Sequence, residues 1–329
     1  MLGKRMRLTG LAAAALLTLS AGATVVAQDE YPSGDISIMA PGGAGGGWDG
    51  TARAMQRALE GGVIDKQVNV YNRRGAAGTI GLAQFVSDFD GDPLQLMVMG
   101  RVMIGGILLN EAPVSLDQIT PIASLTTEWE AIAVSADSPY QNLAELVDAF
   151  KADPTSIVWV GGSAGSTDHM VVARIAQEAG VSPDQINYIP TSGGGEIVTA
   201  LISGSAAAGV SGTSEFAGQI ESGDLRLLAV SSPERIDGID APTIIEASGL
   251  PVEVSNWRGV VAAQNITDDQ KADIVAMIEA MQATDSWQES LAANNWTDFL
   301  QTGAEFEAFL EGEKDTVGTI LVEIGLVTE

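Results

Sequence analysis

The chain contains no cysteine and only one histidine, His169, among its 329 residues. Without cysteine there is no disulfide, no thiolate nucleophile and no thiolate ligand for a metal. A single histidine cannot build a zinc site, and the D-x-[DN]-x-[DN]-G pattern of a calcium loop does not occur. We therefore expect neither a metal nor a cofactor.

Basic residues and long apolar segments are also scarce. Sixteen lysines and arginines face 43 aspartates and glutamates, which gives a formal net charge of −27. A surface of this charge repels nucleic acid and anionic lipid, so nucleic acid is excluded as a partner. Beyond the N-terminal segment, no stretch is long and apolar enough to span a bilayer.

The N-terminal segment has the pattern of a signal for export. Three basic residues precede the apolar run Leu8–Leu19, and Val25–Ala27 forms a cleavage site. The apolar run has about 12 residues, whereas a membrane-spanning helix needs about 20. We expect removal of residues 1–27, which takes away three cations and leaves a periplasmic protein with a net charge of −30.

Short apolar segments alternate with amphipathic helical patterns over most of the chain. This alternation predicts an α/β fold with mainly parallel sheets covered by helices on both faces. The tail differs, since three helical patterns follow one another there without a strand: Thr267–Ala283, Ser286–Asn294 and Ala304–Ile324. The predicted strands are Ile36–Ala40, Val68–Asn72, Leu94–Gly100, Ala131–Ser135, Ile157–Gly161, Ile186–Pro190, Ala207–Ser211 and Leu225–Val230.

Glycine-rich turns follow several predicted strands and open the next helix. They are Pro41–Asp49, Asn72–Gly78, Gly161–Thr167 and Thr191–Gly195. Ligands of open parallel sheets bind outside the carboxyl ends of the strands, so these turns are expected to face one crevice. Unpaired backbone N–H groups at a helix N-terminus attract an anion. About four or five such donors would hold a small carboxylate with micromolar affinity without a buried lysine.

Phosphate-binding loops and a serine hydrolase are the competing interpretations. A dinucleotide fingerprint fails because Trp48 stands where its last glycine belongs, and the mature chain has no Gly-Lys pair for a P-loop. Gly161–Gly165 does match the G-x-S-x-G nucleophile elbow, with Ser163 as the nucleophile. However, His169 follows Ser163 by only six residues, which leaves no room for the order serine, acid, histidine. We expect no catalytic residue and no enzyme activity.

Several side chains near the turns are further candidates for the site. Asp49 and Arg53, four residues apart, predict a helix cap with an ion pair that fixes the first turn. Trp48 could form a wall against the ligand, and Arg101, at the end of a strand, could meet a further carboxylate. The candidate ligand-binding residues are Gly43, Gly45, Gly46, Gly47, Trp48, Asp49, Arg101, Ser163, Ala164, Gly165, Ser166, Thr167, Gly193, Gly194 and Ser211.

Taken in order, these segments resemble one family, the extracytoplasmic receptors of tripartite tricarboxylate transporters, also known as TctC or Bug receptors. The family's P-G-G…D…A-R signature is similar to Pro41–Arg53, and its N-x-x-G-A-x-G-x-x-G segment to Asn72–Gly81. Its S-x-G-S…H loop matches Ser163–His169, and its P-Y-x-G-G-G loop resembles Pro190–Gly195, with threonine at the aromatic position. Later landmarks are Leu228–Val230, Pro242–Thr243, Glu246–Gly249 and Trp257–Gly259.

The resemblance implies a two-lobed periplasmic-binding-protein fold of type II, each lobe a mainly parallel sheet flanked by helices. One lobe would comprise residues 28–124 and 250–329, and the other residues 125–249. Backbone N–H groups and waters of Gly43–Asp49 and Ser163–Thr167 would hold a ligand carboxylate, with Gly193–Gly195 opposite. Closure would present a surface to the large and small membrane subunits of the transporter, and the receptor itself is expected to be a monomer.

The length of the first turn bears on the ligand. Five residues, Ala44–Trp48, separate Gly-Gly from Asp49 here, whereas the common form of the family has two. This form resembles the branch associated with citrate-like tricarboxylates, which makes a tricarboxylate the favoured ligand. A dicarboxylate or an aromatic carboxylate is the alternative, and a sensory receptor would have the same cleft with a different partner.

Overall fold

The computed structural model describes Met1 and residues 31–327, so the predicted signal peptide, 1–27, lies outside the described residues. Within residues 31–327, no helix has both the length and the apolar character that crossing a membrane requires. The contacts group the chain from Tyr31 onwards into one compact unit. The lobe boundaries given above, 28–124 plus 250–329 and 125–249, therefore stay a prediction.

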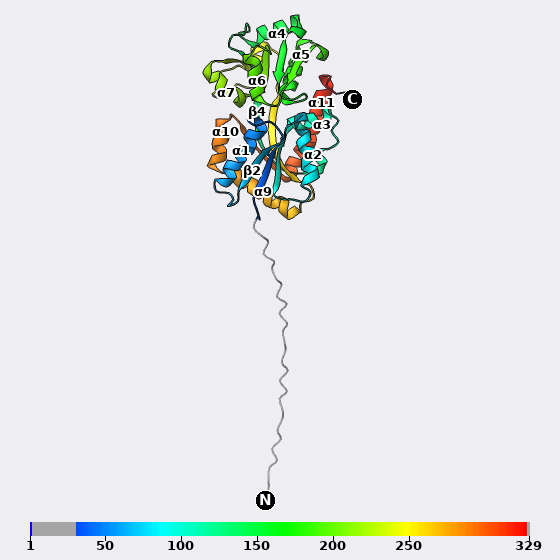
Figure 1. Cartoon of the computed structure of the whole chain (residues 1–329), viewed down its shortest axis with the longest axis vertical. Helices are drawn as coiled ribbons and strands as arrows, with labels where there is room; N and C mark the ends of the chain where they lie inside the picture. The colour runs from blue at the N-terminus through cyan, green and yellow to red at the C-terminus, as the bar shows by residue number, and fades with distance from the viewer. Residues whose placement is uncertain (2–30, 328–329) are drawn as a thin grey trace. The chain divides into compact units, whose positions relative to one another are not determined.

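The described residues form a ten-stranded sheet with helices on both faces (Figure 1). The strands are β1 (Ile36–Ala40), β2 (Val68–Asn72), β3 (Gln95–Gly100), β4 (Ile119–Ser135), β5 (Val158–Gly161), β6 (Asn187–Pro190), β7 (Ala208–Gly212), β8 (Leu225–Val230), β9 (Ser255–Ala263) and β10 (Thr297–Thr302). The helices are α1 (Gly47–Glu60), α2 (Thr79–Asp88), α3 (Arg101–Leu109), α4 (Leu143–Ala152), α5 (Thr167–Ala179), α6 (Gly194–Ile202), α7 (Thr213–Ser222), α8 (Ile244–Ser248), α9 (Asp268–Gln282), α10 (Asp285–Ala293) and α11 (Gly303–Glu323).

Strand β4 is shared between two halves of the sheet, whose order is β2-β1-β3-β9-β4-β7-β5-β6. Its first part, Ile119–Trp129, pairs with β9, and Glu130–Ser135 pairs with β7 and β8. We call the half with β1, β2, β3, β9 and β10 the first lobe, and the half with β5 to β8 the second lobe. Pairs between β1 and its neighbours and between β5 and its neighbours are parallel, whereas pairs that involve β4 or β9 are antiparallel.

Each lobe buries apolar side chains on both faces of its part of the sheet. In the first lobe, Met55 of α1 and Phe85 of α2 are fully buried in separate clusters. In the second lobe, Phe150 of α4 and Phe216 of α7 occupy two further clusters. Figure 1 shows α4 to α7 gathered at one end of this unit and α1, α2, α9 and α10 at the other. Two sandwiches of helices and sheet therefore share one long strand.

All eight predicted strands are present, and their ends agree within one or two residues except at β4, which begins twelve residues earlier. The sheet contains more antiparallel pairs than the alternation of strands and helices predicts, because β9 and most of β4 were not expected. The prediction of a tail without strands is wrong, since β10 lies between α10 and α11 and pairs with β4. None of its six residues is buried, so the apolar alternation that marks a strand is weak there.

The long strand β4 gives a test of this fold. Leu125 is fully buried in β4, at a position where the sequence indicates only a lobe boundary. We expect Leu125→Ala to lower the free energy of unfolding by about 3–5 kcal/mol, because a cavity replaces a core side chain. Leu300→Ala, at an exposed position of β10, should change it by no more than about 0.5 kcal/mol. Urea denaturation that gives equally small changes for both variants would contradict the placement of β4.

Candidate ligand-binding site

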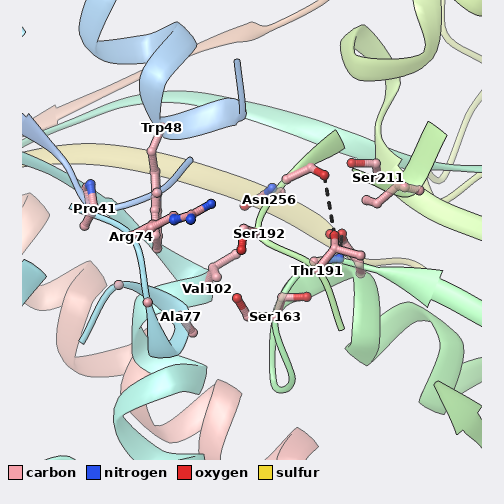
Figure 2. A pocket seen from close by; sticks show the side chains of 18 of the residues that line it. Pro41, Trp48, Arg74, Ala77, Val102, Ser163, Thr191, Ser192, Ser211 and Asn256 are labelled. Atoms are coloured by element: carbon pink, nitrogen blue, oxygen red, sulfur yellow. Dashed lines mark hydrogen bonds between the residues drawn. The ribbon is translucent and has the colours of Figure 1, made fainter. Parts of the chain in front are cut away.

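A cavity of about 140 Å³ lies between the two lobes, where glycine-rich loops meet (Figure 2). In Figure 2, Trp48 and Arg74 lie on one side of the cavity, and Thr191 and Ser211 lie on the other. The first lobe contributes Pro41, Gly42, Trp48, Arg74–Gly78, Val102, Asn256 and Arg258. The second lobe contributes Gly162, Ser163, Ser166, Asp168, Thr191–Gly193, Ile197, Ser211 and Glu215.

The loop before α1 is held by Asp49. The carboxylate of Asp49 accepts hydrogen bonds from Gly45 N (2.9 Å), Arg53 Nε (2.9 Å) and Asn72 Nδ2 (3.0 Å). Burial alone would raise the pKa of Asp49, but these hydrogen bonds outweigh burial and lower it. Gly46, not Asp49, is the residue that caps the helix. The predicted ion pair is present, and Asp49 fixes the shape of the loop from inside the first turn.

The loop before α5 is held by the side chains of that helix. Ser166 caps α5 by accepting a hydrogen bond from His169 N. Gly162 N donates to Asp168 Oδ2 at 2.5 Å, and Gly165 N donates to His169 Nδ1 at 3.2 Å. The His169 ring stacks on Tyr188 with centroids 4.1 Å apart. Burial lowers the pKa of His169 to about 4, so the imidazole is neutral at pH 7.

Some backbone N–H groups of these loops are thus already used within the protein. Those of Gly45 and Gly165 bond side chains, and those of Gly46 and Ser166 bond carbonyls of their own loops. Within residues 31–327, no such partner is found for the N–H groups of Ser163, Ala164, Gly193 and Gly194. These groups lie at or beside the N-termini of α5 and α6, so the second lobe has free donors for an anion.

The two lobes approach most closely through glycines. A Cβ atom placed on Gly46 would lie 3.9 Å from Gly193 Cα, and one on Gly43 would lie 3.1 Å from Ser192 O. The loop before α1 therefore contacts the loop before α6 backbone to backbone. A side chain at position 43 would press on the backbone of Ser192, so glycine there permits the close approach of the two loops.

A buried ion pair lies beside the cavity at the N-terminus of α1. Arg258 of β9 donates from Nη2 to Glu128 Oε1 of β4, and Trp296 Nε1 donates to Glu128 Oε2 at 2.9 Å. The Arg258 guanidinium carbon lies 5.5 Å from the centre of the Trp296 ring, a cation–π contact. The guanidinium occupies the space that a side chain at position 47 would need, so this position requires glycine.

Three further carboxyl groups surround the ion pair. Asp168 and Glu215 line the cavity, and Glu130 is fully buried in β4. Burial raises the pKa of Asp168 to about 7, and it also raises the pKa of Glu215 and of Glu130. Each of these groups lies close to other carboxylates, which raise its pKa further. The cavity is therefore polar and rich in acids, with Arg258 at its edge.

The acids do not form a metal site. Among the described residues, no group of three or more Asp, Glu or His side chains is arranged to hold a metal ion. Ser163 also lacks an activating base, since His169 Nδ1 accepts from Gly165 and the described residues show no hydrogen bond between Ser163 Oγ and His169. The arrangement can bind a small polar molecule through hydrogen bonds and charge.

Of the predicted site residues, five line the cavity: Trp48, Ser163, Ser166, Gly193 and Ser211. Nine others belong to the same loops or to the first turns of the helices that follow them, and are not part of the lining: Gly43, Gly45, Gly46, Gly47, Asp49, Ala164, Gly165, Thr167 and Gly194.

Arg101 is the one candidate that the structure does not bring to the cavity. Its guanidinium donates from Nε and Nη2 to Glu313 (2.9 and 2.8 Å) and from Nη1 to Ser255 O (2.8 Å). Glu313 also accepts from the Trp257 indole. Each nitrogen of the guanidinium donates a hydrogen bond to α11 or β9, so we assign Arg101 a role in joining α3 to α11 and β9.

Sequence reasoning missed several lining residues. Asn256 and Arg258 belong to β9, a strand that was not predicted; the family landmark Trp257–Gly259 marks this segment but was not assigned to the site. Glu215 lies in the first turn of α7, directly after the predicted strand Ala207–Ser211. The position after a strand could have pointed to Glu215, although an acid does not suggest an anion site.

A two-lobed sheet with a small polar cavity between the lobes defines a solute-binding protein of the periplasmic type. Residues 51–326 match the family described as the tripartite tricarboxylate transporter family receptor, and the chain belongs to that family. Protein BugT of Bordetella pertussis is 28% identical over 325 residues, which are 96% of this chain and 97% of BugT.

Solved structures share the fold. The periplasmic binding protein BugD matches with a TM-score of 0.82 at 22% identity, covering 90% of this chain and 99% of BugD. MatC from Rhodopseudomonas palustris with bound malate matches with a TM-score of 0.77 at 17% identity, covering 89% of this chain and all of MatC. A second R. palustris protein, solved with adipate, matches with a TM-score of 0.81 at 20% identity, covering 90% and 99%.

The placement of Arg101 leads to a prediction. Arg101→Ala leaves Glu313 buried without its cation, so we expect the free energy of unfolding to fall by about 3–5 kcal/mol. Ligand affinity should be unchanged, because Arg101 is not part of the lining. Arg235→Ala, which breaks an exposed pair with Glu246, is the control and should cost no more than about 1 kcal/mol. Denaturation and calorimetric titration check both effects, and a loss of affinity without loss of stability would contradict this assignment.

Proposed function

We propose that the protein captures a small carboxylate in the cavity between its lobes and delivers it to the membrane subunits of a tripartite tricarboxylate transporter. Export through residues 1–27 and capture in the periplasm belong to this proposal. The single observation that carries it is the meeting of the loops before α1, α5 and α6 around one small polar cavity. Membership of the receptor family supports it.

The chemistry of the loops favours a carboxylate ligand. Gly193 is the N-cap of α6, and Ser163 and Ala164 lie in the loop just before Ser166, the N-cap of α5, so their N–H groups are free donors near two helix N-termini, which attract an anion. Ser163, Thr191 and Ser211 add hydroxyl groups to the lining. Two proteins of the same fold were solved with malate and with adipate, both of them carboxylates.

We propose binding without chemical turnover. The G-x-S-x-G segment around Ser163 lacks a base, because the described partners of the neutral His169 ring are Gly165 N–H and Tyr188. Ser163 then serves as a hydrogen-bond donor to the ligand.

The proposal also concerns the size and charge of the ligand, a tricarboxylate or a dicarboxylate. The P-G-G…G-W-D form of the first loop favours a citrate-like tricarboxylate. Malate and adipate in proteins of the same fold favour a dicarboxylate. Asp168 and Glu215 in the lining oppose a fully ionised trianion. A tricarboxylate would therefore bind here in a partly protonated form.

A thermal-shift screen of the mature chain against mono-, di- and tricarboxylates tests the proposal. A true ligand at 100 times its Kd should raise the free energy of unfolding by about 2.7 kcal/mol. Ser163→Ala should weaken that ligand roughly tenfold by removing one hydrogen bond. Ser222→Ala, at an exposed position of α7 outside the lining, is the matched control and should bind as the unmodified protein does. If no carboxylate shifts the transition at any pH, the proposed function is wrong.

A further inference from the structure

The lining of the cavity contains carboxyl groups, although the proposed ligand is an anion. Asp168 of α5 and Glu215 of α7 face the cavity, and Glu128 and Glu130 of β4 lie directly behind them. The fully buried cation of this group is Arg258, which is paired with Glu128. If all four acids were ionised, Arg258 would compensate one of their charges and Arg74, the other arginine of the lining, at most a second, before an anion entered.

Both lining acids accept hydrogen bonds from the protein and still line the cavity. Gly162 N donates to Asp168 Oδ2, and Ser211 Oγ donates to Glu215 Oε2. Asp168 also accepts from its own backbone N–H, and Glu215 from the N–H of Gly47. The Arg258 side chain is only 5% exposed, and its Nη1 has no partner. The unsatisfied N–H of this buried guanidinium leaves positive charge beside the cavity, although Nη1 itself is shielded from the space inside it.

An ionised carboxylate offers only acceptors, whereas a protonated carboxyl donates a strong hydrogen bond to a carboxylate. We propose that Asp168 and Glu215 determine the ligand specificity of the site as proton donors, so that carboxylate capture takes up protons from solvent. This inference rests on the proposed function. Protonated Asp168 and Glu215 convert an acidic cavity into an anion site. Such a site favours ligands that share a proton with the protein.

The charges around the pair support the proton uptake. Glu128 and Glu130 on β4 repel a charge on either acid, and Arg258 on β9 compensates only partly. His169 on α5 is neutral, Tyr188 on β6 stays protonated because burial raises its pKa, and Arg74 lies on the exposed side. Because burial already raises the pKa of Asp168 to about 7, a further rise on ligand binding falls in the neutral range.

The direction of the pH dependence follows from linkage. The complex binds more protons than the free protein, so affinity is highest below the free-state pKa and falls as the pH rises through it. For one proton taken up, the fall approaches tenfold per pH unit. Removing a titrating carboxyl should flatten this profile, and a side-chain amide keeps a donor at every pH.

Calorimetric titration of malate, adipate and citrate in turn, between about pH 6 and 9, tests the inference. Titration in two buffers of different ionisation enthalpy gives the number of protons taken up. The unmodified protein should take up protons and bind more weakly as the pH rises. Asp168→Asn and Glu215→Gln should each take up fewer protons and show a flatter dependence of affinity on pH. Each variant is compared with the unmodified protein on the same ligand, so that protons gained or lost by the ligand itself cancel. Asp298→Asn, at an exposed position of β10, is the control and should behave as the unmodified protein does.

Three outcomes would overturn the inference, and they differ in their consequence for the proposed function. Carboxylate binding that is independent of pH and takes up no proton rejects the role of the two acids but keeps the proposed function. Tighter binding of aspartate than of malate, with the preference lost in Asp168→Asn and Glu215→Gln, shows that a ligand ammonium group neutralises the acids instead of protons. Absence of binding for every carboxylate at every pH rejects the proposed function together with the inference.

Discussion

The buried ion pair between Arg258 and Glu128 is the interaction on which the arrangement of the site depends. It joins β9 to β4 just before β4 passes from the first lobe to the second. Trp296 completes the hydrogen bonding of Glu128, and Gly47 leaves room for the guanidinium at the start of α1. A buried pair tolerates the loss of hydration only if its geometry is fixed and its remaining atoms find partners. The position of the first loop, and hence of one side of the cavity, is tied to that geometry.

The second constraint is the excess of acids around this pair. A protein with a net charge of −27 would repel an anion at long range, and Asp168 and Glu215 oppose it at close range as well. Distant surface charges are screened over about 10 Å, so the local groups decide. Backbone N–H groups at helix N-termini provide a positive potential that does not change with pH. The buried carboxyl groups, whose pKa values are raised, are the part of the site that responds to pH.

Much of the fold could be predicted because its signals are local. Strands such as Ile36–Ala40 and Leu225–Val230 are short apolar segments with clear ends, and the structure has them with the same bounds. Strand β10 could not be predicted, because none of its residues is buried and it is a strand only through its pairing with β4. The first part of β4 carries Pro121 and the charged Glu128, which weaken the pattern of a buried strand.

The site likewise has one part that could be predicted from the sequence and one part that could not. The glycine-rich loops could be read from the sequence, since each follows a strand and opens a helix, and Ser163 and Gly193 do line the cavity. The charged side chains could not, because Arg258 and Glu128 are 130 residues apart and meet only through the pairing of β9 with β4. Arg101 was a reasonable candidate at the end of a strand, but the acid that it binds, Glu313, lies 212 residues away.

The most direct test of the central claim is a crystal structure of the mature protein with the carboxylate that binds most tightly. The account predicts a ligand carboxylate between the lobes, with oxygen atoms about 2.7–2.9 Å from N–H groups near Ser163 and Gly193. The electron density of Asp168 and Glu215 should place each carboxyl group within hydrogen-bond distance of the ligand. A ligand bound elsewhere, for example in the separate cavity lined by Leu225 and Ile239, would contradict it.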